Sequence, residues 1–333
     1  MENKTTLNLT VVIPTYNRKE ALIRLLKSFL NVDYQIIDEI IISDNQSSYD
    51  IINTLKQELP HNLFQKCNII INRHNIGGQG NINNSFLLPK TKWMWLIGDD
   101  DTITDNALTI IARDIKNNSD CAWFKYSTAN INAIEENVTI HNLSDFINYY
   151  TIHKRHLGNL VFMSNNIFNI EKLSPYIIYA FEYSYTFVSQ ILPPLMGLNK
   201  EEIYIKYRSD SICNYTIPDN ENQWNCIKIF LGNITIEDLP IEFRSPKEQS
   251  LFKQLFTFWP FITFSRWLEA NWSKIPNKNF ILKICNSLYF PHFNFKEWII
   301  FLLLWLRIRT KLNLFSIIIN SNLLHKIFGK QAK

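Results

Sequence analysis

Polar clusters that directly follow short apolar runs constrain this chain most strongly. Five apolar runs with strand-like composition lie in the first part of the sequence, at 9–13, 36–42, 67–71, 93–97 and 121–126. Segments such as 19–30 and 49–59 separate them and space their apolar residues as one helix face does. Near-continuous apolar strands alternating with helices predict a mostly parallel sheet covered on both faces. The fold class is therefore α/β.

The polar clusters predict one shared binding cleft, because ligands of such sheets bind beyond the carboxyl ends of the strands. Asp44 could accept hydrogen bonds from a base or ribose, or it could cap the following helix. Arg18 is expected near phosphate, although basic residues at helix starts are common. The clusters are Pro14-Thr15-Tyr16-Asn17-Arg18, Asp44-Asn45 and Asp99-Asp100-Asp101.

The aspartate triplet is a candidate metal and diphosphate site. Adjacent carboxylates repel one another, so they are costly at the end of a buried strand unless a counter-charge is present. In an extended segment Asp99 and Asp101 project to the same side, with Asp100 turned elsewhere. Hard oxygen ligands suit Mg²⁺ or Mn²⁺ bridging to phosphate. An acidic turn capping a helix near Thr104 is the alternative, which the neighbouring clusters disfavour.

Glycine usage supports a ligand site beside the triplet. Four of the eight glycines lie between residues 77 and 98. The segment 74–81, which includes Asn75 and Gly77, predicts a loop leading into a helix whose N-terminus faces phosphate. It matches neither the P-loop nor the GxGxxG pattern. A simple turn would use the same glycines.

Composition bounds the remaining possibilities. With 46% hydrophobic and 19% charged residues, the 333-residue chain can bury a sizeable core. Five scattered cysteines without CxxC spacing disfavour disulfides and zinc and indicate a reducing compartment. The polar residues 1–8 predict no secretory signal, and no apolar stretch reaches the ~20 residues of a membrane span. Helices are expected at 144–150, at 175–192 and through most of the last ninety residues.

The C-terminal part is strongly basic. Residues 271–333 hold ten Lys/Arg and a single acid, Glu297, so their net charge is +9. Because the whole chain has a net charge of +4, the first 270 residues sum to −5. The apolar run 298–306 covers only ~14 Å as a helix. A helix in the membrane interface and a buried packing helix are both consistent with it. Nucleic-acid binding is disfavoured, because the rest of the chain is net negative and carries no such motif.

Four segments in order resemble family 2 glycosyltransferases of the GT-A fold, over roughly the first 126 residues. The segments are Val11 to Arg18, Ile41 to Ser47, Asn75 to Gly78 and Trp95 to Asp101. The stretch 93–101 is most similar to the abequosyltransferase-like branch, which builds bacterial O-antigen (lipopolysaccharide) and related surface polysaccharides.

The resemblance implies a GT-A domain, with a Rossmann-like sheet flanked by helices and a helical C-terminal extension. We expect residues 1–126 to bind the nucleotide sugar, 127–240 to bind the acceptor, and 241–333 to form the basic extension. The family pattern implies that Pro14, Thr15 and Asp44 line the nucleotide pocket. It also implies that Asp99 lies near the nucleotide and that Asp101 binds the Mn²⁺ or Mg²⁺ ion.

The implied reaction moves a sugar from a nucleotide donor to a polyprenyl-diphosphate-linked saccharide, with inversion. The expected location is the cytoplasmic, inner face of the bacterial membrane, with the basic helices at its surface. The middle region lacks the Glu-Asp or Asp-Asp pair that often supplies the base, so Glu182 is the candidate, with Glu171 and Asp210 as weaker ones. A sugar-phosphate nucleotidyltransferase, disfavoured because 14–19 lacks glycine, and a non-catalytic nucleotide-sugar-binding protein are the alternatives.

Overall fold

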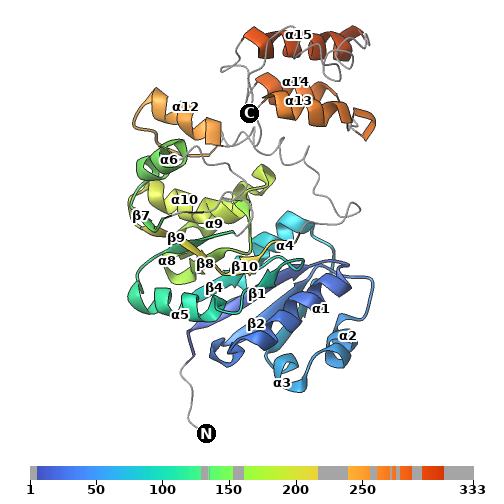
Figure 1. Ribbon diagram of the computed structural model, residues 1–333, viewed down its shortest axis with the longest axis vertical. Coiled ribbons are helices and arrows are strands. Elements are labelled where there is room, and N and C mark those ends of the chain that lie inside the picture. The colour runs from blue at the N-terminus through green and yellow to red at the C-terminus, as the bar shows by residue number, and fades with distance from the viewer. Residues whose placement is uncertain are drawn as a thin grey trace. The chain divides into compact units, whose positions relative to one another are not determined.

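The computed structural model (Figure 1) divides the chain into two compact units, which are described separately. The first comprises 1–224 with 240–242, and the second comprises 225–239 with 243–333. The predicted functional boundaries after residues 126 and 240 stay predictions. The structure describes residues 6–128, 134, 136–152, 161–216, 239–255, 261–270, 272–274, 278–286 and 295–310.

An eight-stranded, mostly parallel sheet forms the centre of the first unit. Strand β8 is antiparallel to both of its neighbours and β7 is antiparallel to β9, whereas the other pairs are parallel. A small antiparallel pair joins β5 (Thr102–Ile103) to β10 (Cys213–Asn214). The order is β3 (Cys67–Ile71), β2 (Glu39–Asp44), β1 (Leu9–Thr15), β4 (Trp93–Leu96), β8 (Asn166–Asn169), β6 (Trp123–Ser127), β9 (Ile205–Ser211) and β7 (Val138–Ile140).

Helices connect these strands and form the described part of the second unit. Those of the first unit are α1 (Lys19–Ser28), α2 (Ile51–Glu58), α3 (His61–Phe64), α4 (Gly78–Asn84), α5 (Ala107–Asn117), α6 (Leu143–Ile152), α8 (Ile170–Leu173), α9 (Ile177–Glu182) and α10 (Leu192–Asn199). Those of the second are α12 (Pro246–Leu255), α13 (Phe261–Ala270), α14 (Asn279–Ile284) and α15 (Phe295–Thr310).

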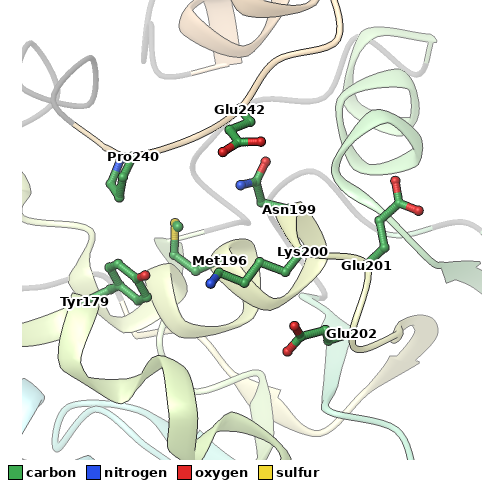
Figure 2. Close-up of a pocket in the computed structure, with 8 residues that line it drawn as sticks. All are labelled: Tyr179, Met196, Asn199, Lys200, Glu201, Glu202, Pro240 and Glu242. Carbon is green, nitrogen blue, oxygen red and sulfur yellow. The ribbon is translucent and has the colours of Figure 1, made fainter.

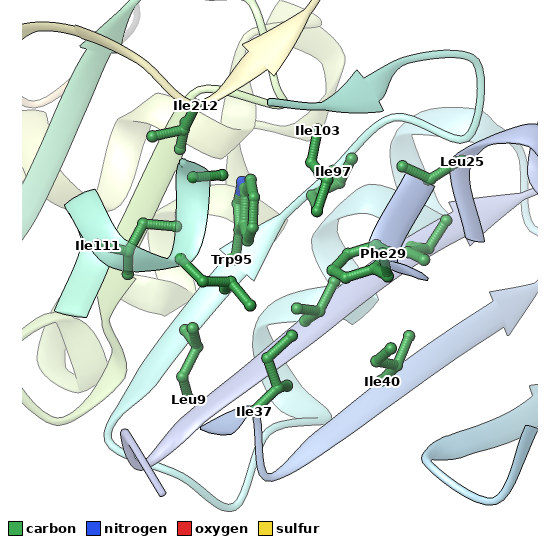
Figure 3. Packing of buried hydrophobic residues seen from close by; sticks show 14 of the residues in the cluster. Leu9, Leu25, Phe29, Ile37, Ile40, Trp95, Ile97, Ile103, Ile111 and Ile212 are labelled. Atoms are coloured by element: carbon green, nitrogen blue, oxygen red, sulfur yellow. The ribbon is translucent and has the colours of Figure 1, made fainter. Parts of the chain in front are cut away.

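The main hydrophobic core lies on one face of the sheet (Figure 3). Side chains alternate along a strand, so the residues that register across β1, β2 and β4 share a face. Val11 pairs with Ile40 and with Trp95, and all three are fully buried in this core. Helices α1 and α5 supply the covering side chains, including Leu25 and Ile111.

The other face of the sheet is also buried by large apolar side chains. Met94 registers with Phe168, and Phe168 registers with Trp123, which stacks on it with ring centroids 5.9 Å apart. Phe86, in the 3₁₀ turn that follows α4, packs on the same phenylalanine at 5.2 Å. Burial on both faces explains why these strands are apolar without alternation.

The stretch expected to be helical at 175–192 is helical in segments and is not one continuous helix. That stretch contains a 3₁₀ turn at Ser174–Tyr176, α9, and further 3₁₀ turns at Ser184–Thr186 and Ser189–Ile191. Phe187 has a φ of +58°, in the left-handed region, which a continuous helix cannot contain. The interruption lets the chain turn back so that the segment around Ser189 contacts α4.

Candidate functional site

A cavity of about 300 Å³ lies at the carboxyl ends of β1 and β4. It receives residues from each of the three polar clusters that the sequence singled out. Pro14 and Thr15 end β1, and Tyr16 and Arg18 follow it. Asn45 follows β2, and Asp99 and Asp100 follow β4. The parallel arrangement of these strands causes the convergence, because their ends meet at one edge of the sheet.

The centre of this cavity is an arginine shared by two aspartates. Arg18 Nη1 donates to Asp99 Oδ1 at 3.0 Å and to Asp100 Oδ2 at 2.8 Å. Arg24 adds a second cation nearby and donates to the main-chain oxygen of Asp100 at 2.7 Å. The counter-charge that the triplet requires is therefore supplied by α1 and its N-cap residue.

Burial leaves Asp99 with an unusual protonation equilibrium. Its side chain is 7% exposed, and desolvation raises the pKa of this carboxyl to about 6. Arg18 and the Thr15 hydroxyl, which donates to Asp99 Oδ2 at 2.7 Å, oppose that shift without cancelling it. The carboxylate is thus incompletely compensated inside the protein.

Asp101 has different partners from Asp99. The Ser164 hydroxyl and the Thr216 main-chain N–H donate to its carboxylate, the latter at 3.1 Å. Burial raises the pKa of Asp101 to about 6, although these donors oppose the shift. Asp101 is not among the residues that line the cavity.

The triplet forms a turn and not the extended segment that the sequence interpretation assumed. The Asp101 N–H donates to the Gly98 oxygen at 3.3 Å and closes that turn. Consequently Asp99 and Asp100 share a cation at the cavity, while Asp101 faces Ser164. An added Cβ at Gly98 would lie 3.1 Å from the Asp100 carboxylate, so a larger residue there would require that carboxylate to shift.

Asp44 organises the second cluster and does not line the cavity. It is 1% exposed and accepts hydrogen bonds from the Ser47 N–H and hydroxyl, the latter at 2.5 Å. It does not cap α2, because Asp50 is the N-cap residue of that helix. Of the two roles considered for Asp44, helix capping is excluded.

The loop that contains Asn75 and Gly77 is tied to the second cluster. Asn45 Nδ2 donates to Asn75 Oδ1 at 2.9 Å, and the Gly77 N–H donates to the same oxygen at 2.8 Å. Gly77 has a φ of +80° immediately before α4, a conformation that favours glycine. These contacts direct the start of α4 toward the cavity, which Gly78 lines.

Three residues near the cavity were missed in the sequence. Asn81, on α4, lines the cavity and exchanges two hydrogen bonds with Ser43, each of 2.8 Å. Met163 also lines the cavity, and Ser164 bridges Asp101 and the Gly98 N–H. Asn81 ends the segment 74–81 that the glycines singled out, but asparagine is so frequent in this chain that the residue itself was not selected. The segment around Ser164 had no recognisable pattern.

The candidate bases lie apart from this cavity lining. Glu182 is exposed at the end of α9, and Glu171 is exposed in α8. Asp210 pairs with Arg113 at 2.7 Å. None of the three lines the cavity, so the assignment of the base to Glu182 stays a prediction.

A larger cavity of about 630 Å³ lies elsewhere in the first unit (Figure 2). Tyr179, Lys200, Glu201 and Glu202 are among its lining residues. Residues 199–202 lie at the end of α10 and shortly before β9. Strand β9 runs parallel to β6, and β6 has the same direction as β4 because both are antiparallel to β8. This cavity therefore borders the amino-terminal edge of the sheet, opposite the three polar clusters.

The donor set at the first cavity fits a divalent cation. The Asp99 and Asp100 carboxylates already converge on one cationic nitrogen. Within the described residues no group of three or more His, Cys, Asp or Glu could hold a metal by itself. Mg²⁺ and Mn²⁺ sites in phosphate-binding enzymes commonly use one or two carboxylates and take further oxygens from the substrate.

Comparison with known proteins gives a consistent result. The family model described as Glycosyl transferase family 2 matches residues 10–182. Abequosyltransferase RfbV of Salmonella typhimurium (strain LT2) is 31% identical over 112 residues, which are 32% of this chain and 32% of that protein. The chain thus matches about a third of the length of that curated relative.

Solved structures resemble the fold. S. aureus TarS 1-349 has a TM-score of 0.55 at 14% identity, over 84% of this chain and 81% of that one. The same TarS fragment in complex with UDP-GlcNAc has a TM-score of 0.57 at 14% identity, over 84% and 79%. Among the described helices, none is both long and apolar enough to cross a membrane.

Proposed function

Because this chain belongs to glycosyl transferase family 2 and is a glycosyltransferase of the GT-A fold, we propose that it binds its donor in the cavity at the ends of β1 and β4. The observation that carries the proposal is the pair Asp99 and Asp100 converging on Arg18 at that cavity. A nucleotide sugar brings a diphosphate, and cations beside carboxylates are the groups that hold one.

We assign the metal contact to Asp99 and Asp100. Both line the cavity, whereas the carboxylate of Asp101 is occupied by Ser164 and Thr216. Asp101, which the family pattern marked as the metal ligand, then acts as a positioning residue that fixes the turn. A bound Mn²⁺ or Mg²⁺ would neutralise the charge that develops on the departing diphosphate.

The remaining donor contacts follow from the lining. Pro14, Thr15 and Tyr16 would border the nucleotide, and Asn45 would offer its amide beside them. Four further residues would act indirectly, by holding these segments in place: Asp44, Asn17, Asn75 and Gly77.

In the reaction, an acceptor hydroxyl attacks the anomeric carbon of the donor sugar. The bond between that carbon and the diphosphate oxygen breaks, and a carboxylate takes the proton of the hydroxyl. Glu182 is the proposed base.

The proposed acceptor is a polyprenyl-diphosphate-linked saccharide in O-antigen-like biosynthesis. Support comes from the partial identity with an abequosyltransferase. Inversion at the anomeric carbon is proposed with it, since a single displacement needs only one base.

A thermal-shift panel of nucleotide sugars with and without Mn²⁺ tests the donor site. A ligand that binds only the folded protein raises its apparent stability, so one donor should give the largest shift, and only with metal. Transfer of that sugar to a lipid-linked acceptor pool should then collapse in Asp100→Asn. Full transfer in EDTA would remove the metal from the proposal, and pyrophosphate release from an NTP would replace it with a nucleotidyltransferase.

Helix α15 supports a peripheral position at the inner face of the cytoplasmic membrane. Four large apolar residues at helical spacing are exposed: Phe295 (77%), Trp298 (42%), Leu302 (54%) and Trp305 (40%). Ile300 and Leu304, on the other side, are fully buried. An exposed aromatic stripe in a basic segment is typical of a helix that lies in the headgroup region.

Vesicle sedimentation tests the membrane contact. The double variant Trp298→Asp/Trp305→Asp should lose binding to vesicles of phosphatidylglycerol and phosphatidylcholine by about tenfold or more. Ile52→Asp is the matched control, because Ile52 is 45% exposed on α2 in the first unit. Equal sedimentation of the double variant and the control would refute the membrane contact and leave the donor site untouched.

A further inference from the structure

Arg18 lies between the two carboxylates that the proposed divalent ion would need. A single nitrogen, Nη1, lies 3.0 Å from Asp99 Oδ1 and 2.8 Å from Asp100 Oδ2. The arginine side chain remains 25% exposed and lines the cavity. Its other guanidinium nitrogens make no hydrogen bond to any residue that the structure describes. The guanidinium is therefore held by two anions on one side and is free to find a ligand on the other.

The backbone before Arg18 is built to hold the residue there. Asn17 has a φ of +53°, which asparagine tolerates better than most residues. Its N–H donates to Ser47 Oγ at 2.8 Å, and its side-chain oxygen accepts from the Ser48 N–H at 2.7 Å. This turn connects the first cluster to the second and starts α1 at Lys19. The location of Arg18 is thus set by the fold and not only by attraction to the aspartates.

A guanidinium and a divalent ion compete for these carboxylates. Both need the same oxygens, and two cations in a poorly solvated pocket repel each other strongly. A metal that arrives alone must displace Arg18 and leave it without a counter-ion. A diphosphate changes this balance, because its oxygens match the planar fork of the guanidinium and give it a new anionic partner.

We propose that Arg18 is a resident counter-ion that suppresses metal binding until the diphosphate of the donor arrives, and then becomes a phosphate ligand. This rests on the proposed donor site. Metal and donor consequently enter as a coupled pair, and by linkage each raises the affinity for the other. The site then avoids a bound metal without donor, and its carboxylates keep a counter-charge in the free enzyme.

Opposite changes in two affinities test this role in Arg18→Gln. The affinity for Mn²⁺ is obtained at pH 8 without nucleotide, from the electron paramagnetic resonance signal of the free ion. The affinities for UDP and GDP are measured by calorimetry in EDTA. The variant should bind Mn²⁺ about tenfold more tightly and the better-bound nucleotide about tenfold more weakly, within the usual range of coupling energies. If Arg18 only maintains the fold, Arg18→Gln would weaken the binding of both Mn²⁺ and nucleotide.

Two matched variants complete the test. Arg24→Gln removes an equal charge that contacts only the main-chain oxygen of Asp100, so its Mn²⁺ affinity should change less than about threefold. Arg18→Lys keeps the charge and should stay near the native Mn²⁺ affinity. Unchanged or weaker Mn²⁺ binding in Arg18→Gln overturns the counter-ion role, whether or not transfer requires metal. Metal-independent transfer would instead contradict the proposed function.

Discussion

Two aspartate–arginine clusters in the first unit use the same chemistry differently. At the cavity, Arg18 reaches Asp99 and Asp100 through one nitrogen. Between α5 and β9, Arg208 makes a two-pronged contact with Asp114, with Nε and Nη2 donating at 2.9 and 2.8 Å. Asp114 is 1% exposed and lines neither cavity described above.

The difference lies in how completely each carboxylate is satisfied. Asp114 also accepts from the Tyr126 hydroxyl at 3.1 Å and from Arg113, so both of its oxygens are committed within the fold. Asp99 has one guanidinium nitrogen and one hydroxyl, and burial still raises its pKa to about 6. A buried charge that the protein satisfies fully serves stability, whereas one left short beside a cavity is available to a ligand.

The largest predicted effect tests the structural role of the Asp114 cluster through the free energy of unfolding. Asp114→Ala leaves Arg208 partly buried without its carboxylate, so we expect a loss of about 3–5 kcal/mol in the free energy of unfolding. Urea denaturation measures it. Nucleotide binding by the remaining folded protein should stay native. A loss under about 1 kcal/mol would show that this cluster is not structural.

Asp100→Asn should give the converse result. Its side chain is 23% exposed, so the fold should lose no more than about 1 kcal/mol. Sugar transfer should fall about 10²–10³-fold, as when one charged group at a developing charge is removed. Initial rates with saturating donor and metal measure the effect, and chemical denaturation is the control. Native transfer by a stable variant would refute our assignment of Asp100.

Much of this site was predictable from local patterns. Polar residues after apolar strands located Thr15, Asn45 and Asp99, because parallel strand ends must meet at one edge of the sheet. The same reasoning failed within the triplet. It assumed an extended segment, whereas the Asp101 N–H returns to the Gly98 oxygen and redirects each carboxylate. Turn geometry of this kind depends on contacts that no local pattern reveals.

The remaining failures have the same physical origin. Ser164 reaches Asp101 across 63 positions of the sequence, and Asn81 reaches Ser43 across 38. The sequence around Ser164 has no recognisable pattern, and the glycine-containing segment that ends at Asn81 does not indicate the contact with Ser43. Phe187, with its positive φ, interrupted the helical stretch that was expected over 175–192. Long-range hydrogen bonds and single unusual backbone conformations are decided by the assembled fold.

A pH titration sharpens the comparison at an intermediate scale. The folded pKa of Asp99 is about 6, above the 3.8 of an unfolded aspartate, so folded protein binds more protons between these values. Its stabilising contribution is therefore present below pH 4 and is lost as pH rises through 6. Asp99→Asn removes this titrating group. Relative to that variant, the free energy of unfolding of the wild type should fall by about 2 kcal/mol between pH 4 and pH 7 in EDTA. A constant difference in unfolding free energy would contradict the raised pKa.

Lysine substitutions at the two arginines resolve the smallest difference. Arg208 uses two guanidinium nitrogens on one carboxylate, a geometry that lysine cannot reproduce, so Arg208→Lys should cost about 1–2 kcal/mol of stability. Arg18 uses a single nitrogen as a point charge, and Arg18→Lys should remain within about 0.5 kcal/mol of wild type. Parallel urea titrations measure both. Equal losses of unfolding free energy in the two variants would mean that the fold holds the two clusters equally tightly. The distinction between a structural charge and one available to a ligand would then rest on the cavity alone.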